Sequence, residues 1–259
     1  MANGPLTGMG VLVTRPRTQA AALADAIERA GGRAFCLPAI EIVPLEPQVI
    51  REVADEQPTP DVVVFISRNA VEHGIRYTDG ARIAVIGPAT AAAVEAAGRV
   101  VDIQPASGYD SEHLLAETPL HEVDGKHVRI IRGSQGRELL AEELRARGAT
   151  VEYLSVYERR VPDVDPDTLA ELERCWRQGD LNVITVMSVE SLANLSTILP
   201  EWCAAQVAST PLVTPSGRVL KEALDRYPAS RPVLAAGPGA EDMVQAIIAL
   251  QHSDAGTAP

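Results

Sequence analysis

The chain carries one α/β pattern twice, each time as a short unit followed by a long one. The short unit reads strand, arginine-bearing turn, helix and strand, and it occurs at residues 9–44 and again at 127–162. The long units follow at residues 61–98 and 180–224. Strands that alternate with helices form parallel sheets covered on both faces. The repeat therefore predicts two similar α/β lobes, with a small molecule expected in the cleft between them.

The order of the units also predicts how the chain is shared between the lobes. Lobe 1 would combine residues 1–34 with 161–259, and lobe 2 would be the continuous stretch 46–149. Residues 35–45 and 150–160 would then be connecting strands that form a two-stranded crossing ladder. An uninterrupted division near residue 122 is the alternative.

Composition narrows the classes of partner. A hydrophobic content of 46% with only 3% aromatic residues predicts aliphatic cores and no platform for stacking bases. A net charge of −12 argues against nucleic-acid or membrane partners, because both need a basic surface. Three scattered cysteines suit a reducing cytoplasm.

Ligands of such sheets bind beyond the carboxyl ends of the strands. The residues expected there are small, hydroxylic or arginine, namely Thr14, Arg15, Ser67, Arg68, 87–90, 132–136, Ser188 and 214–217. Each serine or threonine, taken alone, is best interpreted as a helix cap. Their recurrence at equivalent junctions of both lobes favours a surface that binds anions through main-chain amides and helix N-termini.

Several catalytic motifs are absent from the sequence. It has no GxGxxG, no GxxxxGK[ST] and no GxSxG, and its five histidines lack the spacing of metal ligands. An enzyme of this composition would act by positioning a reactive substrate, with one acid at most.

Tyr157, in LSVYERR on the second crossing segment, is the candidate acid. A phenol keeps its proton at neutral pH and can donate it. Tyr153 lies an even number of residues earlier and is expected on the same face of the strand. The alternative is a half-buried strand tyrosine with its hydroxyl in water.

Taken together, these segments resemble the uroporphyrinogen-III synthases of tetrapyrrole and heme biosynthesis. The resemblance covers about residues 9–250 and rests on an ordered set of segments: VLVTRP, LPAIEIVPL, VVVFISRNAVEHG, IAVIGPATAAAVEAAG, IIRGSQGRELLAEELRARGATVEYLSVYER, VITVMSVESL and PLVTPSGRVLKEAL. It implies two α/β lobes joined by a two-stranded ladder, with the first lobe built from both ends of the chain.

The resemblance also implies a reaction. A lyase of this family closes the linear tetrapyrrole hydroxymethylbilane to uroporphyrinogen III, with inversion of ring D and loss of water. An azafulvene cation and a spiro intermediate are thought to lie on the path, and no cofactor is needed. Without the enzyme the bilane closes to the symmetric type I isomer, so catalysis consists chiefly of folding the substrate in one geometry.

Site residues follow from matching motifs. The resemblance gives Tyr157 the role of assisting loss of the hydroxyl. Contacts to substrate carboxylates are expected from Ser67, Thr90 and Ser188, and from main-chain amides in 132–136 (Ser134, Gly136) and 214–218 (Ser216, Gly217). Arg15, Arg132 and Arg137 are additional expected partners, because guanidinium groups pair well with carboxylates. Many members have Gly-Pro-Thr-Thr where this chain has Thr214–Gly217, so Ser216 is the expected substitute for the missing threonine.

Two other interpretations compete with the enzyme. A bilobal binding module for an anionic small molecule or tetrapyrrole would keep the fold without catalysis. A nucleotide-dependent enzyme is disfavoured by the missing phosphate motifs. For the synthase we expect a monomer in the cytoplasm, in transient contact with the enzyme that supplies hydroxymethylbilane.

Overall fold

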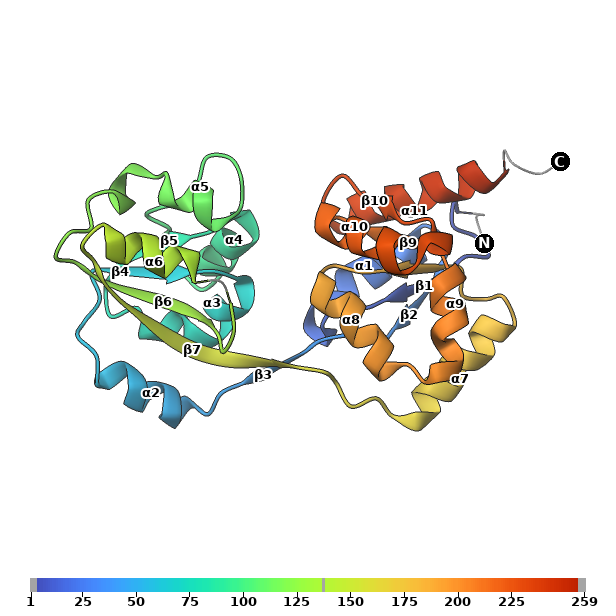
Figure 1. Ribbon diagram of the computed structural model, residues 1–259, viewed down its shortest axis with the longest axis horizontal. Coiled ribbons are helices and arrows are strands. Elements are labelled where there is room, and N and C mark those ends of the chain that lie inside the picture. The colour runs from blue at the N-terminus through green and yellow to red at the C-terminus, as the bar shows by residue number, and fades with distance from the viewer. Residues whose placement is uncertain (1–3, 137, 256–259) are drawn as a thin grey trace. The chain divides into compact units, whose positions relative to one another are not determined.

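The computed structural model describes residues 4–136 and 138–255, which form two compact α/β units (Figure 1). Unit 1 comprises Met1–Glu41 and Arg160–Pro259, and unit 2 comprises Ile42–Arg159. Each unit has one five-stranded sheet, which confirms the predicted α/β class with two similar, mainly parallel sheets.

Unit 1 is built on a sheet with the strand order β10-β9-β8-β1-β2. Its strands are β1 (Gly10–Val13), β2 (Arg33–Cys36), β8 (Val183–Thr185), β9 (Leu212–Thr214) and β10 (Val233–Leu234). Its helices are α1 (Arg17–Arg29), α7 (Pro166–Arg177), α8 (Val189–Ile198), η3 (Glu201–Cys203), α9 (Ala204–Ser209), α10 (Gly217–Arg226), η4 (Pro228–Ser230) and α11 (Ala240–Ala255).

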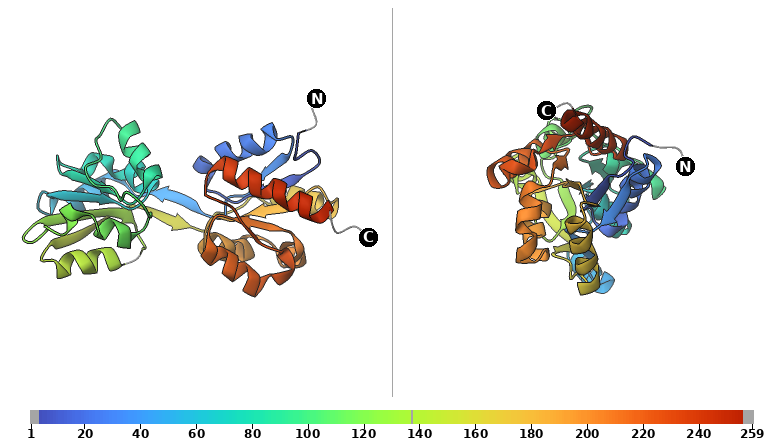
Figure 2. Two further views of the ribbon diagram at one scale, coloured as in Figure 1. Left: turned by 90° about the horizontal axis from the view of Figure 1, so that it is seen from above. Right: turned by 90° about the vertical axis from the view of Figure 1, so that its right-hand side faces the viewer.

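Helices cover both faces of this sheet (Figure 2). Val11 and Val13 of β1 point to one core, which α1 and α11 close. Leu12 points to the other, which α7, α8 and α10 close. This alternation along a fully buried strand explains why GVLV shows no polar side.

Unit 2 repeats the plan with the strand order β3-β7-β6-β4-β5. Its strands are β3 (Glu41–Pro44), β4 (Val62–Phe65), β5 (Arg82–Val85), β6 (His127–Gly133) and β7 (Thr150–Arg160). Its helices are α2 (Pro47–Asp55), α3 (Arg68–Gly74), η1 (Ile75–Tyr77), α4 (Pro88–Ala96), α5 (Ser111–Leu115), η2 (Thr118–Leu120) and α6 (Leu139–Ala146).

Two cores again flank the sheet. Phe65 and Ile131 lie in the core that α2, α3 and α4 cover, here named the α3 face. Val64 and Ile130 lie in the core that α5 and α6 cover, here named the α6 face. The parallel register pairs Val64 with Ile130 and Phe65 with Ile131, so paired residues of the two strands point to the same face of the sheet.

The segments expected to connect the lobes have defined places in the two sheets. Strand β7 spans the whole of 150–160 and pairs with β6 from His127 to Gly133, so it belongs to the unit 2 sheet. Residues 35–45 contain the end of β2 and all of β3, which neighbours β7. The domain limits inferred from the repeat stay a prediction.

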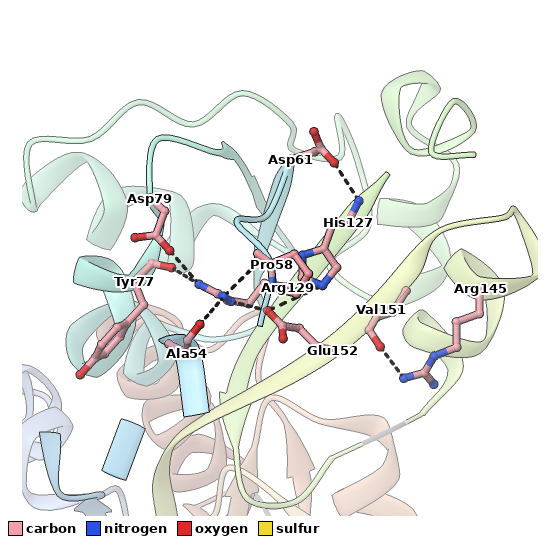
Figure 3. Close-up of polar contacts among 10 residues, drawn as sticks. All are labelled: Ala54, Pro58, Asp61, Tyr77, Asp79, His127, Arg129, Arg145, Val151 and Glu152. Carbon is pink, nitrogen blue, oxygen red and sulfur yellow. Dashed lines mark hydrogen bonds and ion pairs between the residues drawn. The ribbon is translucent and has the colours of Figure 1, made fainter. Parts of the chain in front are cut away.

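A buried ion cluster lies on the α3 face near the start of β6 (Figure 3). The side chain of Arg129 is only 1% exposed. Its Nε donates to Glu152 at 2.5 Å, and its Nη1 donates to Asp79 at 2.9 Å. The carbonyl oxygens of Tyr77 and Ala54 accept from the same guanidinium, each at 3.2 Å. The cluster therefore joins β6 and β7 to η1 and to the end of α2.

Within the described residues, we find no helix with the length and apolar character required to cross a bilayer.

Candidate functional site

Tyr157 and Ser67 meet at the carboxyl edge of the unit 2 sheet. Ser67 follows β4 and caps α3, its Oγ accepting the Ala70 amide at 3.1 Å. Tyr157 on β7 places its hydroxyl 3.2 Å from the same Oγ. The tyrosine side chain is buried, with 1% exposed, whereas Ser67 is half-buried. The structure thus brings together two residues that the sequence predicted from segments 90 positions apart.

The prediction that Tyr153 shares a face with Tyr157 is wrong. Tyr153 packs against the α6-face core, whereas Tyr157 belongs to the α3-face core. The cause is a bulge in β7, because Arg132 pairs with Ser155 but the next residue, Gly133, pairs with Tyr157. One extra residue in a strand reverses the face of every side chain that follows it. The bulge therefore turns Tyr157 toward Ser67.

Gly133 has a role that was not predicted from the sequence. A Cβ atom at this position would lie 2.8 Å from Cε2 of the Tyr157 ring. The amide of Ser134 also donates to the Tyr157 carbonyl oxygen at 2.9 Å. The chain after β6 therefore runs directly against Tyr157, and a glycine immediately following IIR was the available signal.

A half-buried histidine also lies near the pair. His73, on α3, has its ring centroid 6.1 Å from that of Tyr157, with the two planes tilted by 54°. In the sequence it stood out only as one of the histidines without metal-ligand spacing. His73 is therefore an ionisable side chain in ring contact with Tyr157.

Thr90 lies in the first turn of α4, the helix that follows β5. Strands β4 and β5 are neighbours, and α3 packs against α4, so Ser67 and Thr90 begin adjacent helices at one edge of the sheet. Thr90 is buried, and its amide donates to Gly87 O at 3.0 Å. Proline at the first position of α4 suits this helix start, as its sequence indicates.

Arg132 lies on the opposite face of the sheet from Tyr157. Its guanidinium stacks over the Tyr153 ring at 4.4 Å from the centroid and pairs with Glu138 at 3.1 Å. Tyr153 donates its own hydroxyl to the second oxygen of Glu138 at 2.6 Å. Gly136 lies against the guanidinium, since a Cβ there would be 2.9 Å from Nη2. Neither Glu138 nor Tyr153 was predicted from the sequence to contact Arg132.

This contact network has clear electrostatic effects. The hydrogen bond from Tyr153, followed by that from Arg132, lowers the pKa of the Glu138 carboxyl. Burial, followed by the hydrogen bond to Glu138, raises the pKa of Tyr153 to about 12. Near neutral pH the carboxylate therefore accepts from both a protonated phenol and a guanidinium.

The predicted residues of unit 1 also lie beyond strand ends. Ser188 caps α8 through the Ser191 amide at 3.0 Å, and Ser216 caps α10 through the Val219 amide at 3.4 Å. Arg15 donates from Nη2 to the carbonyl oxygen of Pro238 at 2.5 Å. These contacts agree with the capping interpretation, and they leave the expected carboxylate contacts untested.

Two more predicted positions lie at the junction between β9 and α10. Gly217 opens α10, and a Cβ there would meet nothing within 4 Å, so the backbone is openly accessible. Thr214 is fully buried and accepts the Ser216 amide at 3.2 Å, which fixes the turn of the altered TPSG segment. Arg137 lies outside the described residues.

Comparison with known proteins places the chain in a family. The family model described as "Uroporphyrinogen-III synthase HemD" matches residues 21–245. The chain belongs to the uroporphyrinogen-III synthase family. The uroporphyrinogen-III synthase of Salmonella typhimurium (strain LT2) is 32% identical over 205 residues, which cover 75% of this chain and 81% of that one. The Escherichia coli K12 enzyme is 29% identical over the same length and shares.

Solved structures of the uroporphyrinogen-III synthase family support the fold. A mutant synthase from Thermus thermophilus aligns with a TM-score of 0.59 at 18% identity, covering 94% of this chain and 99% of that one. The synthase of Helicobacter pylori 26695 aligns with the same TM-score at 11% identity, covering 93% and 99%. This chain therefore shares the fold of these two solved synthases.

Proposed function

We propose that this chain is a cyclising lyase that converts hydroxymethylbilane to uroporphyrinogen III, with inversion of ring D and loss of water. The observation that carries the proposal is the contact between the hydroxyls of Tyr157 and Ser67 in a chain that belongs to the synthase family. The contact places a proton donor beside a half-buried hydroxyl at the edge where parallel sheets bind ligands.

The burial of Tyr157 determines how its proton is delivered. Because this side chain is 1% exposed, Ser67 is the member of the pair that a substrate reaches first. The Ser67 oxygen can accept from the Ala70 amide and from the phenol while it donates its own proton outward. Ser67 then passes the proton of Tyr157 to the leaving group.

The chemical step balances with these groups. The C–O bond of the hydroxymethyl group breaks and its electron pair leaves with the oxygen. A proton from Ser67, replaced from Tyr157, completes a molecule of water, and an azafulvene cation remains on the bilane. Ring D attacks this cation through its substituted carbon, and the spiro intermediate fragments and recloses. Loss of a proton on closure returns the system to its starting protonation, with one water released.

The substrate carboxylates would be bound by hydrogen-bond donors at the strand ends. Caps and helix N-termini present amides to anions. The proposed contacts are Ser67, Thr90, Ser134 and Gly136 in unit 2, and Arg15, Ser188, Ser216 and Gly217 in unit 1. Arg132 belongs to the same edge of unit 2, with its guanidinium turned to Glu138.

We propose further that the protein acts as a monomer in the cytoplasm, in transient contact with the enzyme that supplies its substrate. Cys36, Cys175 and Cys203 are free thiols, which suits a reducing compartment. Sedimentation velocity with and without the preceding enzyme tests the assembly state.

A coupled assay tests the function. Hydroxymethylbilane is generated in situ, the protein is added, and the oxidised products are separated by chromatography. We expect dominant type III isomer. Type I product alone, formed at the spontaneous rate, would contradict the proposal and favour a binding module for an anionic tetrapyrrole.

A further inference from the structure

The guanidinium of Arg132 contacts the last residue of β6 and two residues of the chain that follows it. Its Nε donates to the carbonyl oxygen of Gly133 at 3.3 Å. Its Nη2 lies against Gly136, where an added Cβ would come within 2.9 Å. Its Nη1 pairs with Glu138, the residue that immediately precedes α6. One side chain thus contacts Gly133, Gly136 and Glu138.

Tyr153 contacts both Arg132 and Glu138. The guanidinium stacks over its ring at 4.4 Å, and its hydroxyl donates to Glu138 at 2.6 Å. Both oxygens of the Glu138 carboxylate therefore have a donor from the chain itself. We call Arg132, Glu138 and Tyr153 the Arg132 clamp.

Exposure indicates how the clamp can act. The side chain of Arg132 is 6% exposed, whereas that of Glu138 is 53% exposed. A carboxylate from solution could reach this guanidinium only after Glu138 had left it. The Arg132 guanidinium stacks on the Tyr153 ring and pairs with the Glu138 carboxylate, which also accepts the Tyr153 hydroxyl. Each of the three side chains therefore contacts the other two.

We propose that the Arg132 clamp sets the main-chain conformation of residues 133–136, with Arg132, Glu138 and Tyr153 as positioning residues. The inference rests on the proposed function, because this turn carries amides expected to bind substrate carboxylates. The Ser134 amide is already bonded to Tyr157 O. Among residues 4–136 and 138–255, the amides of Gln135 and Gly136 have no hydrogen-bond partner. The clamp therefore presents these two amides to an anion.

Two single variants test the clamp from opposite sides. Glu138→Gln removes the charge from the ion pair, and Tyr153→Phe removes one hydrogen bond while it keeps the ring under Arg132. We expect each to raise KM for hydroxymethylbilane by about 3- to 10-fold, with kcat unchanged within about twofold. We also expect faster hydrogen exchange in both variants at the Ser134 amide, whose bond to Tyr157 O depends on the conformation of this turn.

The controls change the same groups elsewhere. Glu171→Gln removes the charge from a carboxylate that is also 53% exposed and pairs with Arg33 at 3.3 Å. Tyr77→Phe removes a hydroxyl that donates to Pro47 O at 3.2 Å in the same unit. Neither control should alter KM or the exchange of the Ser134 amide.

The outcomes separate the clamp from direct binding and from the proposed function. A lower KM in Glu138→Gln would overturn the clamp, because it would mean that a substrate carboxylate replaces Glu138 on Arg132. Unchanged exchange in both variants would overturn it as well. Exchange needs no substrate, so faster exchange in a protein that forms only type I product would retain the clamp and refute the synthase.

Discussion

The hydroxyl oxygen of Tyr157 lies 3.2 Å from that of Ser67, which also accepts the Ala70 amide in the first turn of α3 at 3.1 Å. A helix cap is normally a local device. Here the same oxygen joins a buried phenol on β7 to the edge of the sheet. Local stability and proposed proton transfer therefore depend on one atom.

We expect Tyr157→Phe to lower kcat by about 10²-fold or less, because acid catalysis contributes ~10²–10⁴ and the substrate already has a reactive leaving group. The fall should appear in single-turnover measurements of type III product. Tyr77→Phe, which also removes one hydroxyl from unit 2, is the matched control. Wild-type kinetics in Tyr157→Phe would remove its role as the acid.

Ser67→Ala should affect both stability and turnover. Loss of the cap should cost about 1 kcal/mol of unfolding free energy, and loss of the relay should reduce kcat about as much as Tyr157→Phe. Because the two residues act on one proton, the double variant should be little worse than either single variant. Asp165→Ala, which removes the cap of α7 at Thr168, should reduce stability alone. Additive losses of kcat in the double variant would argue against the relay.

Gly133→Ala should destabilise unit 2 by about 1–3 kcal/mol, because the new methyl group would press on the Tyr157 ring. The measurement is urea unfolding followed by circular dichroism. In a Tyr157→Ala background the ring is absent and the cost should fall by more than half. An equal cost in both backgrounds would show that contact with this ring is not the cause.

The ion cluster of Figure 3 predicts a large effect far from the candidate site. Arg129→Met leaves the partly buried Glu152, whose side chain is 11% exposed, without the guanidinium and should destabilise unit 2 by about 3–5 kcal/mol. The double variant with Glu152→Met should recover most of this loss. Both tryptophans, Trp176 and Trp202, lie in unit 1, so their fluorescence provides an internal control. A loss that persists in the double variant would contradict this account.

Alkaline titration tests the Tyr153–Glu138 contact. The pKa of Tyr153 is raised from 10.0 to about 12, so the folded state holds this proton more tightly than the unfolded state. Its contribution to stability should be complete below pH 10.0 and disappear as pH approaches about 12. The difference in near-ultraviolet absorbance between wild type and Tyr153→Phe should titrate near 12. A midpoint near 10.0 would contradict the contact.

Acid should act on the same contact in the opposite sense. The pKa of Glu138 is lowered from 4.5, so the carboxylate is favoured in the folded state. Its stabilisation is present above pH 4.5 and should be lost as pH falls below that value. The protection of the Ser134 amide, measured as its exchange rate relative to an unstructured peptide at the same pH, should therefore fall at acid pH in wild type but much less in Glu138→Gln. Equal acid dependence in both proteins would exclude Glu138 as the titrating group.

Sequence reasoning succeeded where the signal was local. Ser67 follows a fully buried VVVF strand directly, so its place at a strand end could be predicted from adjacent residues. The position of Tyr157 on a strand was predictable for the same reason. The face of the sheet to which Tyr157 points was not predictable. Tyr153 and Tyr157 are an even number of residues apart, which predicts one face, but the extra residue in β7 between them places them on opposite faces.

Long-range polar contacts were beyond such reasoning. Arg129 finds Glu152 23 positions later and Asp79 50 positions earlier. No sequence periodicity indicates that these residues are partners, because each charged residue taken alone is expected on the solvent-exposed surface. Arg132 and Glu138 are only six apart, but their pairing depends on the turn at Gly133 and on the ring of Tyr153. These pairings depend on which side chains are buried in the fold, and the sequence alone does not show this.

The divided unit has a consequence for the order of synthesis. Strand β1 emerges first from the ribosome, but β8, its neighbour in the sheet, begins only at Val183. All of Ile42–Arg159 is translated in the interval and can complete its own sheet. The early β1–α1–β2 segment must wait with one strand edge unpaired, which is the condition that invites misassembly. In the nascent chain, folding of unit 1 therefore begins before unit 2 is translated and ends after it. Unit 1 has the greater need of a chaperone.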